Sequence, residues 1–396
     1  MLTVGVVYHV YALTGSTAAS AVLMFASIAP QVLLGPLAGV WVDRWDRKRV
    51  MVTANLLMAV TLAPLLLVHA ASQVWIFFTV MVVQNSLATV FTPAEQATLP
   101  LLVPEQERTR ANALYGQNQN IARLAGSALG GVAVASGGMA AVALADAASF
   151  LIAAALVAPI ASMQAAHDAT LRRTVGDRIA AVRDELADGI AWMRRHHAIR
   201  VLAVFMLFTS TGEGVMGTLF SPFVRTILHD TNADYGTVLA AQALGGIVGG
   251  LVAAAWAHKA SPARLCAVGA VLFGALDLSI FLYPLAYAAV WPAVVGMLLV
   301  GLPGAVMTAA LMTLFQNGTE DRNRGRVFAA LSAIMGLSAL CGVAAAGLLA
   351  PRIGIVPVIA FQGAGYILAG LGIFLVLRPQ AGAAQSSLAP SGAPPA

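Results

Sequence analysis

Charged residues are scarce in this chain. Only 10% of its 396 residues are Asp, Glu, Lys or Arg, while 59% are hydrophobic and the mean hydropathy is +0.83. Soluble domains contain about 25% charged residues, so this composition excludes an ordinary soluble protein. Because lipid offers a backbone no hydrogen-bond partners, apolar runs of about 20 residues cross a bilayer as helices. The composition therefore predicts an all-α integral membrane protein.

The residues that would support several other chemistries are also missing. The two cysteines, Cys266 and Cys341, both lie inside apolar runs, which argues against a disulfide or a metal site. The seven histidines are scattered without ligand spacing. No G-x-x-x-x-G-K-[ST] motif occurs, so this chain encodes no ATP motor. We therefore expect neither an enzyme nor a bound cofactor or metal.

The apolar runs form two sets of six. The first set covers about residues 1–13, 17–42, 50–70, 73–97, 111–136 and 139–161, and the second about 198–224, 234–257, 263–284, 287–315, 326–350 and 355–377. We predict twelve transmembrane helices in two bundles, 1–161 and 198–378, with a linker at 162–197 and a disordered tail at 379–396. The first run would extend about 20 Å, short of a hydrocarbon core of about 30 Å. Either the start codon is assigned too late or this copy is truncated.

The linker should contain one amphipathic helix. Its apolar residues recur at three- and four-residue steps, at Val175, Ile179, Val182, Leu186, Ile190 and Met193. We expect this helix to lie on the inner leaflet or against the cytoplasmic ends of other helices, in preference to binding a partner protein.

Basic residues set the orientation, because Lys and Arg stay in short cytoplasmic loops. Most of the 22 Lys and Arg fall on one side of the predicted helices, at 44–49, 108–110, 172–200, 259–264, 322–326 and 378. The other side has Arg225 and Arg352. The even-numbered loops, the linker and the C-terminus are therefore predicted to be cytoplasmic. The net charge of +5 reflects this topology and needs no nucleic acid to explain it.

The two halves look like parallel copies. Gly35-x-Leu37 aligns with Gly249-x-Leu251 at an offset of 214 residues, and residues 104–114 align with 319–329 at an offset of 215. Such repeats build transporters whose substrate site lies near the midplane between the halves.

Several stretches carry a family resemblance. GPLAGVWVDRWDRKR at residues 35–49 resembles the signature loop between helices two and three of the major facilitator superfamily. The stretches at 91–114, 144–157, 189–202 and 322–331 resemble its bacterial branch of enterobactin-exporter-like and macrolide-efflux-like proteins. The similarity covers about residues 1–378. The resemblance implies the major facilitator fold and outward transport of a drug-like or siderophore-like molecule.

The signature loop has two possible roles. By resemblance, Gly35, Gly39, Asp43, Arg44, Asp46, Arg47 and Lys48 would form a gating loop that latches the halves together on the cytoplasmic side and parts when the transporter opens inward. The two glycines share a helical face and would let another helix come close. The alternative is that the basic residues only anchor the loop in the cytoplasm. The two acids add nothing to a topology signal, which favours the latch.

Ionisable residues inside membrane spans are costly and by default functional. The candidates are Glu95, Arg123, Asp146, Glu213 and Asp277. Glu213 lies near the middle of its run between two glycines, where a carboxylate could take up and release a proton as its surroundings alternate. A carboxylate that only bonds in a helix contact and never titrates is the alternative. Arg123 and Asp146 could pair, and a structural pair is the simpler interpretation.

Other candidates are weaker. Gly126, Ser127, Gly130 and Gly131 resemble the antiporter motif G-P-x-x-G-G, with Ser127 in place of the expected proline. Cavity lining or interhelical hydrogen bonding would suit the polar residues Gln84, Asn85, Gln117, Asn118, Asn120 and Gln242. Gly245, Gly246, Gly249 and Gly250 indicate close helix packing.

These observations predict a monomeric secondary transporter in the bacterial inner membrane that exports a small molecule at the expense of the proton gradient. Uptake or facilitated diffusion of a metabolite is the first alternative. An inactive copy, or a membrane partner that transports nothing, is the second.

Overall fold

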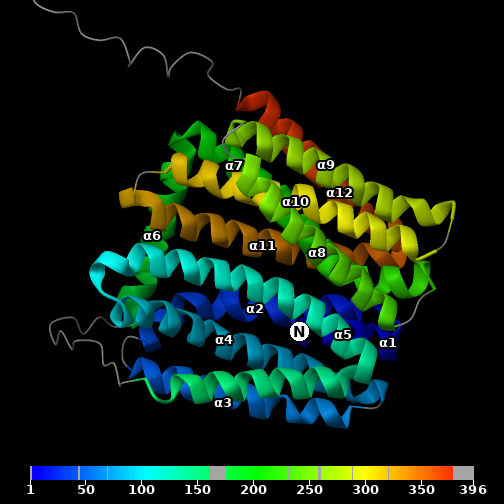
Figure 1. Ribbon diagram of the computed structural model, residues 1–396, viewed down its shortest axis with the longest axis horizontal. Helices are drawn as coiled ribbons and strands as arrows, with labels where there is room; N and C mark the ends of the chain where they lie inside the picture. Colours follow the sequence, from blue (N-terminus) through cyan, green and yellow to red (C-terminus); the bar gives the residue numbers. More distant parts are fainter. Residues whose placement is uncertain are drawn as a thin grey trace, which may run out of the picture.

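The computed structural model describes residues 2–42, 45–68, 70–160, 175–229, 232–256, 260–287, 289–319 and 321–377. Within these ranges the long elements are all helices, and they form two bundles that lie one above the other in Figure 1. The first bundle contains α1 (Leu2–Thr14), α2 (Thr17–Val42), α3 (Arg47–Thr61), α4 (Trp75–Leu102) and α5 (Arg108–Val157). The second contains α7 (His197–Pro222), α8 (Asn232–Trp256), α9 (Pro262–Leu282), α10 (Trp291–Asn317), α11 (Asp321–Ile353) and α12 (Ile355–Val376).

The long helix α5 is two antiparallel helices joined without a loop. Gly137 and Gly138 interrupt it with non-helical backbone, and Gly138 has φ 60° and ψ −147°, a conformation that only glycine adopts readily. The chain turns back there (Figure 1), so the boundary predicted between residues 136 and 139 is confirmed.

Ten of the described helical segments are long and apolar enough to cross a membrane. The other two predicted spans are α1, which has 13 residues, and the first half of α5, which begins with basic residues. Large apolar side chains such as Leu33, Leu156 and Leu251 are about 70% exposed on the bundle surface. A water-facing surface would not carry so many, whereas a lipid-facing surface requires them.

Two backbone junctions confirm the internal repeat. Gly15 and His229 both have positive φ, follow the first helix of their bundle, and lie 214 residues apart. Gly138 and Gly354, which also have positive φ, lie 216 residues apart before the last helix of each bundle. Asp46 caps α3 and Ser261 caps α9, each by accepting a hydrogen bond from the backbone N–H three residues later. The offsets agree with those predicted from the sequence.

The bundles meet mainly along two helix pairs. One pair is α2 with α11, and the other is α5 with α8. Small residues permit the first contact, since a Cβ added at Gly347 would lie 2.6 Å from Ala21 and one at Gly336 would lie 3.1 Å from Val32. A shared interface of this kind lets two rigid bundles rock against each other.

The linker helix α6 (Val175–Arg195) lies at one end of the molecule, at the left of Figure 1. It packs against α11 and also contacts α7 and α2, so it touches both bundles. Gly189 permits this packing, because a Cβ added there would lie 3.0 Å from Ala330, and Asp188 bonds Arg326 at 3.2 Å. The amphipathic helix is confirmed, although Ile190, predicted for its apolar face, is 45% exposed. Met193 is buried as predicted, and Gly189 is buried beside it in place of Ile190.

Close packing of α8 against α10 confirms one interpretation of the glycine run. A Cβ added at Gly249 would lie 2.6 Å from the carbonyl oxygen of Leu302, whereas one at Gly250 would meet nothing within 4 Å. The two adjacent residues therefore differ in role.

We expect alanine at these two positions to shift stability in opposite directions. Gly249→Ala forces the helices apart and should cost about 1–3 kcal/mol. Gly250→Ala should gain up to about 1 kcal/mol, because alanine is the better helix former. Thermal unfolding of the two variants in the same detergent, followed by tryptophan fluorescence, compares them directly. Equal melting temperatures would show that α8 and α10 are not in close contact at Gly249.

Candidate functional site

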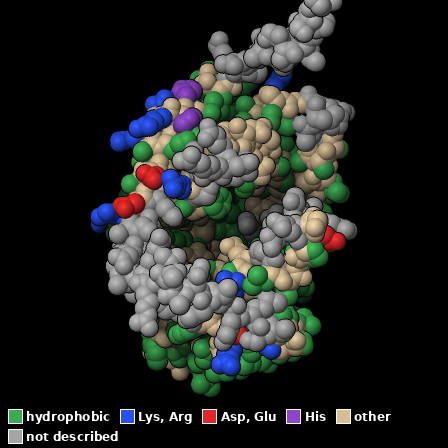
Figure 2. All heavy atoms as spheres, turned by 90° about the vertical axis from the view of Figure 1, so that its left-hand side faces the viewer, with side chains coloured by type: hydrophobic (Ala, Val, Ile, Leu, Met, Phe, Trp, Pro, Cys, Tyr) green, Lys and Arg blue, Asp and Glu red, His purple; other side chains and the backbone are tan. Residues whose placement is uncertain are grey.

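The end of the molecule that carries α6 is open between the bundles. Figure 2 shows this face, which is hollowed at its centre and carries exposed arginines of α6, α7 and α11. Gly35, near this end of α2, is exposed and would have nothing within 4 Å of an added Cβ. Among the described residues, no helix comes close to Gly35 in this conformation.

The opposite end is closed by contacts between the bundles. The Tyr11 hydroxyl of α1 and the Thr226 hydroxyl, in a π-helical turn after α7, form a 2.6 Å hydrogen bond. The rings of Tyr8 and Tyr235 pack 5.3 Å apart, and the Arg225 guanidinium lies 5.8 Å from the centre of the Tyr8 ring. These contacts join α1 to α7 and α8, so the conformation is open toward α6 and shut at the other end.

Glu213 is the central feature of the second bundle. It lies on α7, where the flanking Gly212 and Gly214 are buried against α12 and α11, but its own side chain is exposed. Its Oε1 accepts a 2.6 Å hydrogen bond from the Tyr366 hydroxyl and a 3.2 Å bond from Nε2 of Gln362. Both donors are on α12. Two hydrogen bonds thus fix one oxygen and leave the carboxylate accessible.

These partners are residues that the sequence analysis did not identify. Gln362 is polar within a strongly apolar helix, which is a usable signal, and it corresponds to Asp146 at the 216-residue offset of the second junction. Tyr366 gives no such signal, because a tyrosine in a membrane helix is common. Only the helix packing reveals that it faces α7.

An apolar groove lies on the same side of α7 as Glu213. Met206, two helical turns from Glu213 and on the same face, lines the groove with α10 and α11. Its other walls are Leu311, Met312, Phe315, Phe328, Leu331, Ser332 and Met335. The cavity here is only about 30 Å³ in this conformation, and its methionine side chains are flexible and polarizable.

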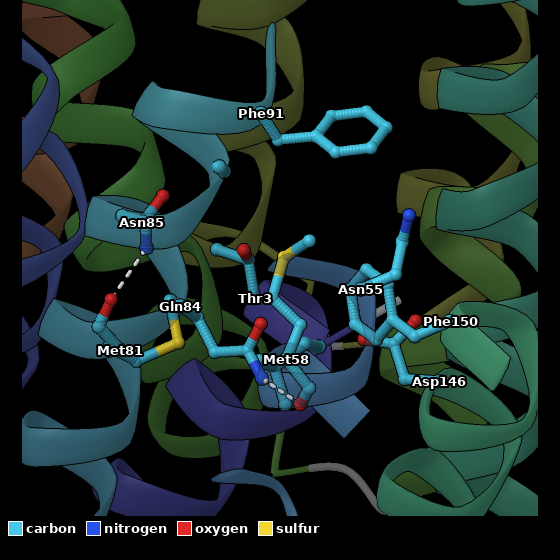
Figure 3. A pocket seen from close by; sticks show the side chains of 11 residues that line it. Thr3, Asn55, Met58, Met81, Gln84, Asn85, Phe91, Asp146 and Phe150 are labelled. Carbon is cyan, nitrogen blue, oxygen red and sulfur yellow. Dashed lines mark hydrogen bonds between the residues drawn. The ribbon is translucent and has the colours of Figure 1, made fainter. Parts of the chain in front are cut away.

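The first bundle contains a pocket of about 340 Å³ between α1, α3, α4 and α5. Figure 3 shows polar side chains among apolar ones on its walls: Thr3, Asn55, Gln84, Asn85 and Asp146. Nε2 of Gln84 donates to the Met58 carbonyl at 2.7 Å and the Thr61 hydroxyl at 3.0 Å, while Asn85 bonds within its own helix. Gln84 therefore both bonds α4 to α3 and lines the pocket.

The remaining predicted residues fall into three groups. Glu95, a candidate ionisable residue, accepts a 2.8 Å bond from the Tyr115 hydroxyl, which ties α4 to α5. Gly126 and Gly130 lie in α5, Gln242 is half-buried in α8, and Asn118 is exposed. The positions outside the described side chains are Arg123, Ser127, Gly131, Gln117 and Asn120. The predicted pair of Arg123 with Asp146 is among these untested interpretations.

The signature loop is described in part. Asp43 and Arg44 lie outside the described residues, as do the surroundings of Gly39. Asp46 caps α3 by accepting from the backbone N–H of Arg49 at 2.8 Å, and Arg47 donates to the Ala97 carbonyl of α4 at 2.9 Å. Lys48, on the first turn of α3, is half-buried. These contacts all stay within the first bundle.

The cap gives Asp46 a role that needs no charge. Asp46→Asn should keep the cap, because asparagine caps as well as aspartate, whereas Asp46→Ala should lose it at a cost of about 1 kcal/mol. Melting temperatures of the two variants test this. A large loss in both variants would instead assign the negative charge to a contact such as the predicted latch.

The fold of two repeated six-helix bundles, open at one end, defines a membrane transporter. The family model of the Major Facilitator Superfamily matches residues 1–211 and 201–395, and the chain belongs to this family. It is 24% identical over 362 residues to macrolide efflux protein A of Streptococcus pyogenes, covering 90% of this chain and 86% of that protein. It is 23% identical over 366 residues to an uncharacterized MFS-type transporter of Bacillus subtilis, covering 90% and 83%.

Solved structures share the same fold. A bacterial homolog of the human lysosomal transporter Spinster, in its inward-facing and unoccupied conformation, superposes with a TM-score of 0.64 at 13% identity, over 95% of this chain and 91% of that one. The nucleoside transporter NupG superposes with a TM-score of 0.68 at 10% identity, over 96% and 94%. The predicted likeness to macrolide-efflux proteins is confirmed, and the comparisons add nothing on enterobactin exporters.

Proposed function

We propose that this chain is a proton-driven exporter of apolar, drug-like molecules in the bacterial plasma membrane. The observation that supports this most is the exposed carboxylate of Glu213 on the same face of α7 as Met206, which lines the apolar groove of α7, α10 and α11 two helical turns away. A carboxylate on an adaptable apolar wall suits a lipophilic molecule with a basic nitrogen, because the charge is paired while the apolar body is buried. The similarity to macrolide efflux proteins agrees with this substrate class.

The cycle follows from the two ends of the molecule. The basic residues on the α6 face favour a cytoplasmic position for that face and for the C-terminus. A substrate then enters from the cytoplasm between the bundles, and the contacts of Tyr11 and Tyr235 at the far end part to release it outside. A proton on Glu213 would compete with a cationic substrate for the same carboxylate. The proton gradient thereby drives the exchange, in a monomer that needs no bound cofactor.

Export is tested by expressing the full chain in a bacterial host that lacks its own efflux pumps. We expect expressing cells to accumulate several-fold less radiolabelled erythromycin than cells with an empty vector, and a protonophore to abolish the difference. The Gly250→Ala variant serves as a folded control. Higher accumulation in expressing cells would instead show uptake. Equal accumulation across a panel of lipophilic cations would contradict export of this substrate class.

A further inference from the structure

A second acid lies behind Glu213 in the same bundle. Asp277 on α9 is only 1% exposed, and among the described residues its Oδ2 has no hydrogen-bond partner. Gln362 on α12 is 2% exposed, and its Oε1 likewise has no partner, although its amide nitrogen donates to Glu213. Two buried acceptor atoms, one on α9 and one on α12, are therefore unsatisfied among the described residues, which native interiors rarely tolerate.

The two residues lie where α9 and α12 touch. A Cβ added at Gly363 would lie 2.7 Å from the Gly274 carbonyl oxygen and 2.9 Å from the Leu278 backbone nitrogen. Asp277 and Gln362 are the chain neighbours of Leu278 and Gly363. The ring of Tyr366, which donates to Glu213, packs 4.5 Å from Phe273 at the same contact. The cluster therefore connects α9, α12 and α7.

A charged Asp277 would be costly in this place. A carboxylate without donors in an apolar interior loses its hydration and gains nothing in exchange. The charge of Glu213 also acts on Asp277, and like charges repel most strongly in a low dielectric. Tyr366 on α12 is a further ionisable group near Asp277, and α10, which also packs on α9, contains no ionisable side chain. No described positive group compensates the charge.

We infer that Asp277 is a second proton-binding site, whose bound proton is donated from Oδ2 to Oε1 of Gln362. A single proton then satisfies both unpartnered acceptors. The Gln362 amide connects the site to Glu213. Loss of a proton from Asp277 therefore changes the hydrogen bonding and the electrostatic field at the exposed carboxylate. In the exchange the carboxyl group of Asp277 releases its proton to water and later takes one up again. This assignment rests on the proposed proton coupling, which it extends from one carboxyl group to two.

The direct test is infrared difference spectroscopy of the purified protein in lipid at neutral pH, which needs no transported substrate. We expect a carboxylic-acid carbonyl band that shifts in D₂O and is lost in the Asp277→Asn variant. The Asp146→Asn variant, which changes an acid of the first bundle, is the matched control and should retain the band. Asparagine is isosteric with a protonated aspartate and can donate to Gln362, so Asp277→Asn should fold and melt like the wild type.

Three outcomes would overturn the inference. The first is identical carbonyl bands in wild type and Asp277→Asn, which would place the charge on Asp277. The second is a band that disappears on addition of sodium chloride, which would assign the site to a sodium ion. The third is a much lower melting temperature of Asp277→Asn, which would mean that a charged aspartate is required. None depends on whether the chain exports erythromycin, so failure of the proposed function remains distinguishable.

A second measurement concerns the number of coupled protons. In proteoliposomes with the membrane potential clamped, the radiolabelled erythromycin ratio at zero net flux should change about tenfold per pH unit for each coupled proton. We expect Asp277→Asn to lower this dependence by about tenfold per pH unit. An unchanged dependence would show that the Asp277 proton stays bound throughout the cycle.

Discussion

Glu213→Gln is expected to abolish proton-driven export, with a loss of more than about thirtyfold. The amide keeps an oxygen that accepts from Tyr366 and Gln362, so the variant should fold normally. It can neither bind a proton nor pair with a cation, and losing a charge-assisted hydrogen bond to a cationic substrate costs about 2 kcal/mol, or about thirtyfold. Erythromycin efflux from inverted vesicles with an imposed pH gradient measures the effect.

Glu95→Gln is the matched control for this experiment. Glu95 also lies in a membrane helix and also accepts a bond from a tyrosine, Tyr115, but in the first bundle between α4 and α5. We expect this variant to transport at close to the wild-type rate. Wild-type efflux by Glu213→Gln at every pH would remove Glu213 from the coupling mechanism.

Linking Tyr11 to Thr226 is expected to stop transport completely. Their hydroxyl groups bond at 2.6 Å across the closed end, and release of a substrate at that end requires the two bundles to part there. Cysteines at both positions, joined by a bifunctional thiosulfonate reagent with a spacer of several ångströms, would hold that end shut. A spacer is required because a direct disulfide needs Cα atoms within about 7 Å.

The scarcity of cysteine makes this experiment clean. Cys266 is buried and Cys341 is exposed, so Cys341→Ala removes the accessible background thiol. Transport should return on reduction, and neither single variant, Tyr11→Cys or Thr226→Cys, should respond to the reagent. If the linked protein exports at the rate of the untreated protein, the release pathway does not pass between α1 and α7.

The sequence predicts the helices of this fold well because each helix depends on features of its own short stretch of sequence. Apolar length marks the spans, and glycine marks the junctions at Gly138 and Gly354. The repeat offset follows from short motifs, and the structure reproduces it to within two residues at three separate features. The amphipathic helix α6 was predicted from its period, but the exposed Ile190 shows that a period fixes the orientation of a face only approximately.

The site is harder to predict, because its contacts join residues far apart in the chain. Gln362 and Tyr366 meet Glu213 from about 150 residues away, and the facing of each side chain depends on helix rotation. A helix that is apolar all round has no periodic signal to reveal that rotation. Glu213 could be identified from the sequence because an ionisable side chain inside a membrane span is energetically costly. Tyr11 and Thr226, which close the far end, carry no such signal, because they are neutral residues.

The short junctions described above also determine how the molecule meets its surroundings. At the end opposite α6, only Gly15 and Ser16 separate α1 from α2, only Gly137 and Gly138 separate the halves of α5, and only Gly354 separates α11 from α12. Antibodies and proteases bind extended chain segments, and these one- and two-residue junctions offer almost none. The connections between α3 and α4 and between α9 and α10 are longer. Epitope tags and fluorescent labels are therefore better placed in longer connections such as these than at the three glycine junctions.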